Sequence, residues 1–110
     1  MSDNEYIRQT FYDFISNADE SYSTYLHIDY MSGQLDIDRQ YLQQYLIELG
    51  ILTRAVYPQP TNIAVAQGLI VNCLTKTGNR YWLYTESILN AFVELDILNA
   101  LRIDHPSVSD

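Results

Sequence analysis

The chain has 110 residues, one cysteine and a formal net charge of −8. This length is typical of one domain whose core suffices without cross-links, so we expect a single globular domain over residues 1–110. One cysteine excludes an intramolecular disulfide. Six Lys and Arg against fourteen Asp and Glu disfavour direct nucleic-acid binding, because that affinity comes largely from cations that neutralise phosphates. No apolar run approaches the roughly 20 residues of a membrane-spanning helix, so we expect a cytoplasmic protein without a membrane partner.

The charge is spread unevenly along the chain. Residues 1–48 contain nine carboxylates and two arginines, whereas residues 49–85 contain no Asp or Glu and three cations, Arg54, Lys76 and Arg80. Such an asymmetry produces a surface field that can select a partner. We expect the acid-free stretch to form core sheet, from which charge is excluded.

The first element is expected to be a helix. Ser2 to Glu5 fit a capping box, and Ile7, Phe11 and Ile15 recur at helical spacing. The polar residues from 17 to 23 then predict a loop, so the helix should end near Asn17.

A strand and a second helix are expected next. Residues 25–31 alternate between two faces, which predicts a strand, and Ser32-Gly33 predicts the turn after it. Asp36 or Asp38 is positioned to cap the second helix. Its inner face should contain Leu42, Tyr45, Leu46 and Leu49, and Gly50 should end it.

The middle of the chain is punctuated by prolines. Pro58-Gln59-Pro60 predicts extended backbone, after which Thr61 or Asn62 could cap a short helix ending at Gly68. Residues 63–68 also suit a strand, so both possibilities stay open. Residues 69–75 and 80–84 flank Lys76-Thr77-Gly78-Asn79, which predicts a β-hairpin.

The last element is expected to be one helix from Glu86 to Leu101 with Thr85 as its cap. Apolar residues surround more of this helix than one buried stripe requires, so it is either central to the fold or shared with a second subunit. Residues 104–110 should form a frayed tail. The order of elements predicts an α+β fold, with three main helices packed on a short antiparallel sheet and a hairpin near 69–84.

Residues with catalytic or metal-binding chemistry do not form a recognised motif. His27, Asp29, Cys73 and His105 lack the spacing of metal ligands, and the apolar sequence around Cys73 predicts a small, buried, inert thiol. Asp36 and Asp38 lie beside a helix start, where acids usually serve as caps. We therefore expect no enzyme, no metal and no cofactor.

One segment resembles a known family. Lys76 and Arg80 lie at the hairpin, with Tyr81, Trp82 and Tyr84 on its second strand. A helix that ends in residues 46–52 and is followed by this hairpin resembles a winged-helix domain over about half the chain. The segment departs from the family pattern because roughly twenty residues separate the helix from the hairpin. Its candidate reading helix also has only one cation and contains Arg39, Gln43, Gln44 and Glu48. The alternative, which we favour, makes Trp82 and its neighbours core residues.

Carboxylates alternate with tyrosines between Asp19 and Tyr45. Tyrosine is enriched at interface hot spots, and acidic groups among such rings favour a basic partner. The alternative is a solvated acidic face with half-buried tyrosines. The predicted partner-binding residues are Asp19, Glu20, Tyr22, Tyr25, Asp29, Tyr30, Asp36, Asp38, Tyr41 and Tyr45.

Three functions are consistent with these features. The first is a non-catalytic, acidic protein-binding module that inhibits or regulates a partner through its basic, nucleic-acid-binding surface. In size, acidity and low lysine content the chain is similar to phage anti-defence proteins and other DNA mimics. The second is a homodimeric structural or regulatory adaptor that associates through residues 86–101. The third is a degenerate winged-helix DNA-binding regulator.

Overall fold

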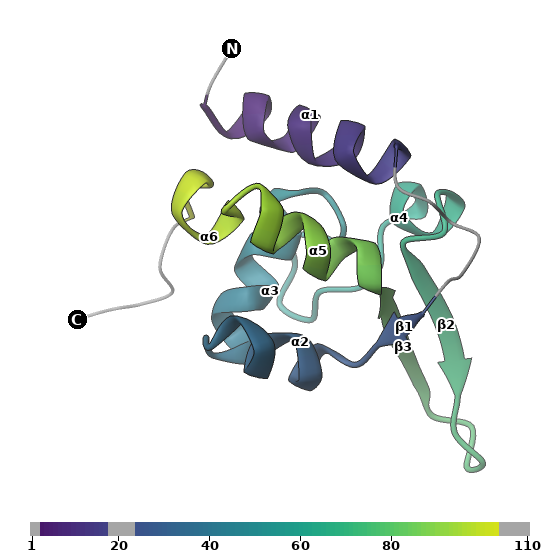
Figure 1. Cartoon of the computed structure of the whole chain (residues 1–110). Coiled ribbons are helices and arrows are strands. Elements are labelled where there is room, and N and C mark those ends of the chain that lie inside the picture. Colours follow the sequence, from purple (N-terminus) through teal and green to yellow (C-terminus); the bar gives the residue numbers. More distant parts are fainter. Residues whose placement is uncertain (1–2, 18–23, 104–110) are drawn as a thin grey trace.

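The protein is described by a computed structural model over residues 3–17 and 24–103. Helices pack beside one end of a small antiparallel sheet, which confirms the α+β prediction (Figure 1). In chain order the elements are α1 (Asp3–Ser16), β1 (Tyr25–Leu26), α2 (Ile28–Leu35), α3 (Arg39–Glu48), α4 (Asn62–Ala66), β2 (Ile70–Leu74), β3 (Arg80–Thr85), α5 (Glu86–Glu94) and α6 (Ile97–Ala100). The helices in the described residues are too short and too polar to cross a bilayer.

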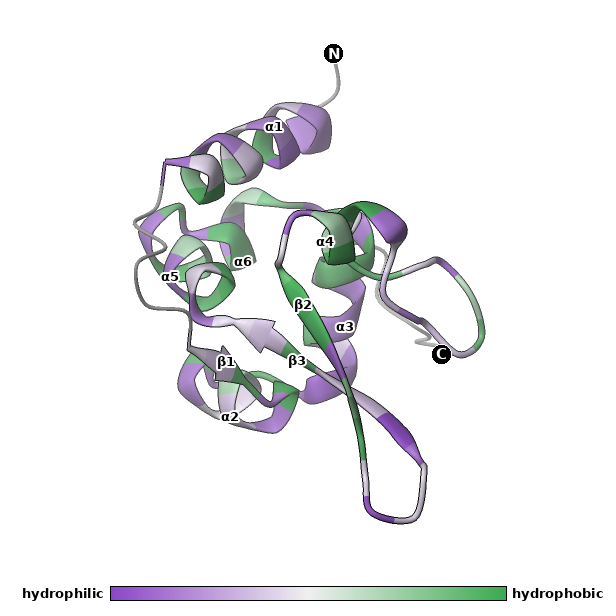
Figure 2. Cartoon of the chain, turned by 90° about the vertical axis from the view of Figure 1, so that its right-hand side faces the viewer, coloured by the Kyte–Doolittle hydropathy of each residue, from purple (hydrophilic) through white to green (hydrophobic). Residues whose placement is uncertain are grey.

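The sheet has the order β1-β3-β2, so β3 is its central strand. Tyr84 of β3 pairs with Leu26 on one side and with Ile70 on the other. The predicted hairpin is confirmed, and Gly78 adopts φ 86° in its turn, a conformation that glycine accepts without steric cost. The hairpin projects away from the helices (Figures 1 and 2).

The core lies between the helices and the inner end of the sheet. α5 packs against α1, α6 and β3, and its Ile88, Ala91 and Phe92 are almost inaccessible. α1, which ends close to the predicted position, contributes Phe11 and Ile15, while α3 contributes Leu42 and Leu46. Burying each of these larger side chains stabilises the fold by about 1.5–3 kcal/mol.

The predicted strand over residues 25–31 is wrong beyond Leu26. Residues 28–35 form α2, and the predicted turn residues Ser32 and Gly33 lie inside it. Ile28 and Met31 face the core three residues apart, which is a helical spacing. His27 begins the helix, because its Nδ1 accepts the backbone N–H of Asp29 at 3.1 Å.

The second predicted helix is confirmed as α3. Asp38 occupies its N-cap position, but its side chain makes no capping hydrogen bond, and Asp36 instead ends α2 in a left-handed conformation with φ 56°. Gly50 ends the helix with φ 81°, and Ile51 N–H donates to the Leu46 carbonyl at 2.9 Å. The chain therefore turns back toward the sheet immediately after α3.

The helical alternative for the middle segment is the correct one. Thr61 caps α4 because its Oγ1 accepts the Ala64 N–H at 3.1 Å. The Thr61 hydroxyl also donates to the Gly50 carbonyl at 2.7 Å, which ties α4 to the end of α3. α4 thus fills part of the long connection between α3 and the hairpin.

The single helix predicted for residues 86–101 is wrong in its length. α5 ends at Glu94, and Asp96 adopts φ 52° before α6 begins at Ile97. The chain changes direction there, so both Phe92 in α5 and Ile97 in α6 face the core. The change of direction explains the broad apolar distribution that one straight helix could not bury.

Two glycine substitutions test the helix boundaries. Gly33→Ala should stabilise the protein by about 0.5–1 kcal/mol, because Gly33 lies inside α2 and an added Cβ meets no atom within 4 Å. Gly50→Ala should destabilise it by about 1–2 kcal/mol, because alanine is strained at φ 81°. Urea unfolding of both variants measures these differences, and a destabilising Gly33→Ala would contradict α2.

Candidate functional site

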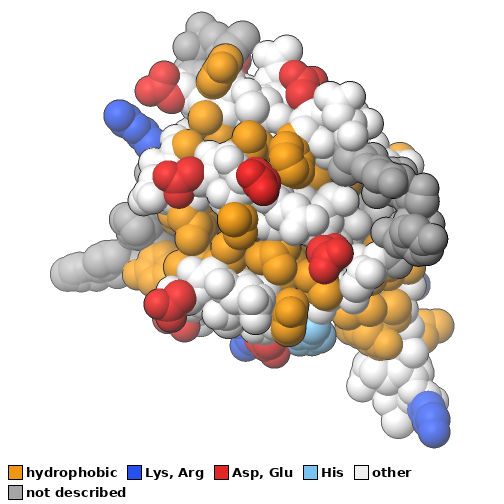
Figure 3. Space-filling view, in the orientation of Figure 1, with side chains coloured by type: hydrophobic (Ala, Val, Ile, Leu, Met, Phe, Trp, Pro, Cys, Tyr) orange, Lys and Arg blue, Asp and Glu red, His pale blue; other side chains and the backbone are white. Residues whose placement is uncertain are grey.

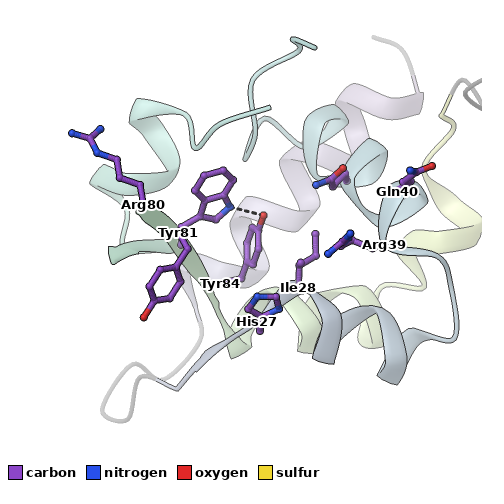
Figure 4. Close-up of a pocket in the computed structure, with 9 residues that line it drawn as sticks. His27, Ile28, Arg39, Gln40, Arg80, Tyr81 and Tyr84 are labelled. Carbon is purple, nitrogen blue, oxygen red and sulfur yellow. Dashed lines mark hydrogen bonds between the residues drawn. The ribbon is translucent and has the colours of Figure 1, made fainter. Parts of the chain in front are cut away.

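A groove separates the hairpin from the start of α3. It encloses about 340 Å³ and lies between β3 on one side and α2 and α3 on the other (Figure 4). Its lining consists of His27, Ile28, Arg39, Gln40, Gln43, Arg80, Tyr81, Trp82 and Tyr84. We refer to this set of residues as the α3–hairpin groove.

The helical side of the groove consists of the first turns of α3. Arg39, Gln40 and Gln43 share one face because residues three and four apart are neighbours on a helix. Arg39 and Gln40 are exposed and Gln43 is half-buried. Arg39 Nη1 lies 3.3 Å from Oδ1 of Asp29 in the first turn of α2, which holds the guanidinium near the groove.

The hairpin side depends on the alternation of β3. Arg80, Trp82 and Tyr84 point to one face of the strand, because side chains two apart in a strand share a face. Trp82 Nε1 donates to the Tyr84 hydroxyl at 2.8 Å, the dashed line in Figure 4, and this bond holds together two rings that line the groove. Burial raises the pKa of Tyr84 to about 12, so its hydroxyl stays protonated at neutral pH.

The groove lining contains cations and amides but no carboxylate. Among the described residues, no carboxylate pairs with Arg80 or with Lys76 at the hairpin turn, whereas Arg8 and Arg54 both pair with Glu48. Figure 3 shows a basic side chain at the tip of the projecting hairpin and carboxylates spread among hydrophobic side chains over the helices. In the described part of the chain, the two hairpin cations, Lys76 and Arg80, therefore form no ion pair with an acid.

Burial does not explain the absence of acids from this region, and the expectation of core sheet is wrong for most of it. Only Ile70 is buried in β2, and residues 75–81 are all exposed. Cys73 is half-exposed, so the predicted buried thiol is also wrong. Trp82 is half-buried, intermediate between the core and surface alternatives. An exposed hairpin tolerates Asp and Glu sterically, so burial does not account for their absence from it.

Metal chemistry gains no support from the geometry. Within residues 3–17 and 24–103, no group of three or more His, Cys, Asp and Glu side chains gathers closely enough to hold an ion. His27 uses its Nδ1 as the cap of α2 and lies 3.4 Å from an Asp29 oxygen, so its role there is structural.

The structure separates the predicted partner-binding residues into several places. Asp19, Glu20 and Tyr22 lie outside the described residues. Tyr25 donates its hydroxyl to the Gly68 carbonyl at 3.2 Å, and Asp29 pairs with Arg39 beside the groove. Tyr30 is exposed on α2, and Asp36 is the exposed C-cap of that helix.

Three of these residues do come together. Asp38, Tyr41 and Tyr45 line a hollow of about 310 Å³ with Ile37, on the opposite side of α3 from Arg39. Tyr45 is held there because its hydroxyl donates to the Leu98 carbonyl at 2.8 Å. We refer to these four residues as the tyrosine hollow.

The predicted site did not include the α3–hairpin groove. The prediction weighted total charge, whereas the groove is created by the pairing of β3 with β1, which brings α2 and α3 beside the hairpin. The sequence did contain a signal, since Arg39, Gln43, Arg80 and Trp82 are all in the segment that resembles a winged-helix domain. Gln40 and His27 were missed because their positions depend on where α2 and α3 begin.

The order of the elements is the next feature of the site. A helix, a short strand, three helices and a hairpin follow one another, and the first strand pairs with the second hairpin strand. α4 lies in the connection before the hairpin. No protein-family model matches the chain, and searches of the curated proteins and of the solved structures found no significant match.

Alkaline unfolding tests the buried tyrosine that lines the groove. Burial raises the folded-state pKa of Tyr84 from 10.0 to about 12. The stability that the protonated hydroxyl gives the folded state is therefore fully present below pH 10. Stability should then fall by about 1.4 kcal/mol for each pH unit between 10 and 12, as the unfolded chain releases the proton first. In urea titrations, Tyr84→Phe should remove this part of the pH dependence. Tyr57→Phe, in which the ring is 81% exposed, should match the unaltered chain.

Proposed function

We propose that the protein binds double-stranded nucleic acid, with α3 and the hairpin as the contacting elements. The observation that carries the proposal is the α3–hairpin groove: its lining has two arginines, two glutamines and a histidine but no carboxylate, in a chain with fourteen acids. The winged-helix order of the elements supports it, because that order exposes one helix beside a projecting hairpin.

The α3 face has the chemistry of base recognition. An α-helix fits the major groove of B-form DNA, where Arg pairs with guanine edges and Gln pairs with adenine edges. Arg39, Gln40 and Gln43 provide those groups on one face, near the N-terminal end of the helix. Helices of helix-turn-helix proteins also contact bases through their N-terminal residues.

The hairpin has the chemistry of phosphate contact. Lys76 and Arg80 are exposed on an element that projects from the body of the protein (Figure 1). Contacts to phosphates position a protein on a duplex without reading its sequence. The hairpin therefore anchors the protein while α3 makes the sequence-dependent contacts.

The net charge of −8 sets the strength of this binding. The carboxylates on α1, α2, α3 and α5 repel phosphates, and salt screens charges separated by more than about 10 Å at 0.1 M. The hairpin projects from these helices, so the repulsion it experiences is reduced at moderate salt. With few phosphate contacts the affinity should be modest and should change little per decade of salt.

Arg80→Ala tests the proposed phosphate contact. It should weaken binding to a labelled random-sequence duplex about tenfold, because one charge-assisted contact is lost. It should also lower the slope of log affinity against log salt by about 1. Fluorescence anisotropy over a salt series measures both, and the emission of Trp82, the single tryptophan, reports contact in the groove.

Arg102→Ala is the matched control, since it removes the same charge at the far end of the fold. It should change affinity only slightly, because Arg102 lies beside α1 rather than in the groove. The absence of duplex binding at low salt, or equal losses from Arg80→Ala and Arg102→Ala, would contradict the proposal.

A second function is favoured by the tyrosine hollow. There Asp38 and Tyr41 lie beside the apolar Ile37 and the anchored Tyr45, so a carboxylate adjoins a recessed aromatic surface. This combination suits an arginine side chain of a basic protein, which stacks on aromatic rings and pairs with carboxylates. The tyrosine hollow thus keeps the hypothesis of an acidic protein-binding module, with Asp38, Tyr41 and Tyr45 as the predicted residues that remain.

Asp29→Asn separates the two functions by the sign of its effect. It frees Arg39 from its ion pair and removes one negative charge beside the groove, so duplex binding should strengthen several-fold. Binding of an arginine-rich peptide should instead stay constant or weaken, as measured by calorimetry. Asp38→Asn should weaken peptide binding specifically, and Glu94→Gln on α5 is the control of equal charge.

A further inference from the structure

We infer that the free edge of β2 pairs with the same edge of a second copy of this chain. β2 is an outer strand in the order β1-β3-β2, so one row of its backbone N–H and C=O groups faces away from β3. Proteins usually protect such an edge with charge, proline or a covering element. β2 consists of Ile70, Val71, Asn72, Cys73 and Leu74, so it has no charged residue and no proline.

The surface around this edge is apolar. Leu74 is 66% exposed and Val71 is 38% exposed, and Ile63 and Val65 of the preceding α4 are also exposed. In Figure 2, the hydrophobic parts of β2 lie beside α4. Exposed apolar groups that gather in one place mark interaction sites, whereas scattered ones need no explanation.

The charge distribution permits a second copy to approach this edge. No Asp or Glu occurs between residues 49 and 85, whereas α1, α2, α3 and α5 all carry carboxylates. Two copies of a chain with net charge −8 repel each other through those helices. The β2 edge is a surface where the copies can approach without placing carboxylates against carboxylates.

The shape of the edge is also complementary to itself. An antiparallel pair centred on Asn72 places Leu74 of one copy opposite Ile70 of the other, and opposite residues point to the same face of a sheet. That face adjoins a hollow of about 700 Å³, which is lined by Val65 and Ala66 of α4. The hollow has a mixed lining, in which Gln59, Asn62, Asn72 and Arg80 are the polar members. The most exposed apolar side chain of β2 enters its apolar part beside Val65 and Ala66, and the two-fold symmetry repeats the contact.

This pairing leaves most of the α3–hairpin groove accessible. Arg80 lines both the groove and the hollow, but the other groove residues, on β3, α2 and α3, are not part of the hollow, and the hairpin tips with Lys76 point in opposite directions. The dimer itself does not depend on nucleic-acid binding. If that proposed function holds, two grooves on one face of a joined sheet double the number of cations available to one duplex.

Sedimentation equilibrium without nucleic acid tests the inference. The unaltered protein should show a concentration-dependent mass up to twice 12.8 kDa. Leu74→Asp should weaken association at least tenfold without loss of folding, because the side chain it replaces is exposed. Val71→Cys should form an intermolecular disulfide with Cys73 on oxidation, because the proposed register places these positions opposite each other.

Val93→Asp is the matched control, since Val93 is 65% exposed on α5. It should leave association unchanged. A monomer at every concentration would overturn the inference. A dimer that Val93→Asp breaks and Leu74→Asp does not would place the interface on residues 86–101 instead. These results are obtained without nucleic acid, so a failure here is distinct from a failure of duplex binding.

Discussion

The fold depends on the position of β3 between two other strands. β3 pairs with β1, which leads into α2, and with β2, which follows α4, and it continues directly into α5. Tyr84 lies where these elements meet and is 2% exposed. Because one strand connects the hairpin to the helical body, the orientation of the hairpin relative to α3 is fixed by main-chain hydrogen bonds rather than by a few side chains. The groove is a consequence of that pairing.

The same arrangement separates two electrostatic environments. The helical body carries the carboxylates, and Glu48 pairs with both Arg8 and Arg54 there. The hairpin projects from that body with Lys76 and Arg80, and acids are excluded from it in sequence although its exposure would permit them. Total charge is therefore a poor guide to this protein, because a partner meets a local field and not a sum.

The sequence predicted the parts of the fold that depend on local signals. Gly50 and Gly78 marked a helix end and a hairpin turn because each position requires a positive φ. The segment from Tyr25 to Met31 misled because Ile28 and Met31 fit a helix, while the neighbouring tyrosines also fit the alternation of a strand. His27 caps the helix through its hydrogen bond to the Asp29 N–H, and neither composition nor alternation predicts that bond.

The candidate site shows a different limit. Its residues come from three separate segments, around His27, Arg39 and Arg80, and only the pairing of β1 with β3 brings them together. Pairing between distant strands is hard to predict from one sequence, because a two-residue strand such as β1 is too short to show an alternation of side chains. The predicted partner residues clustered along the sequence, and the fold dispersed most of them while placing Asp29 beside Arg39. This ion pair connects the acidic body to the groove, so it is where the two electrostatic environments compete.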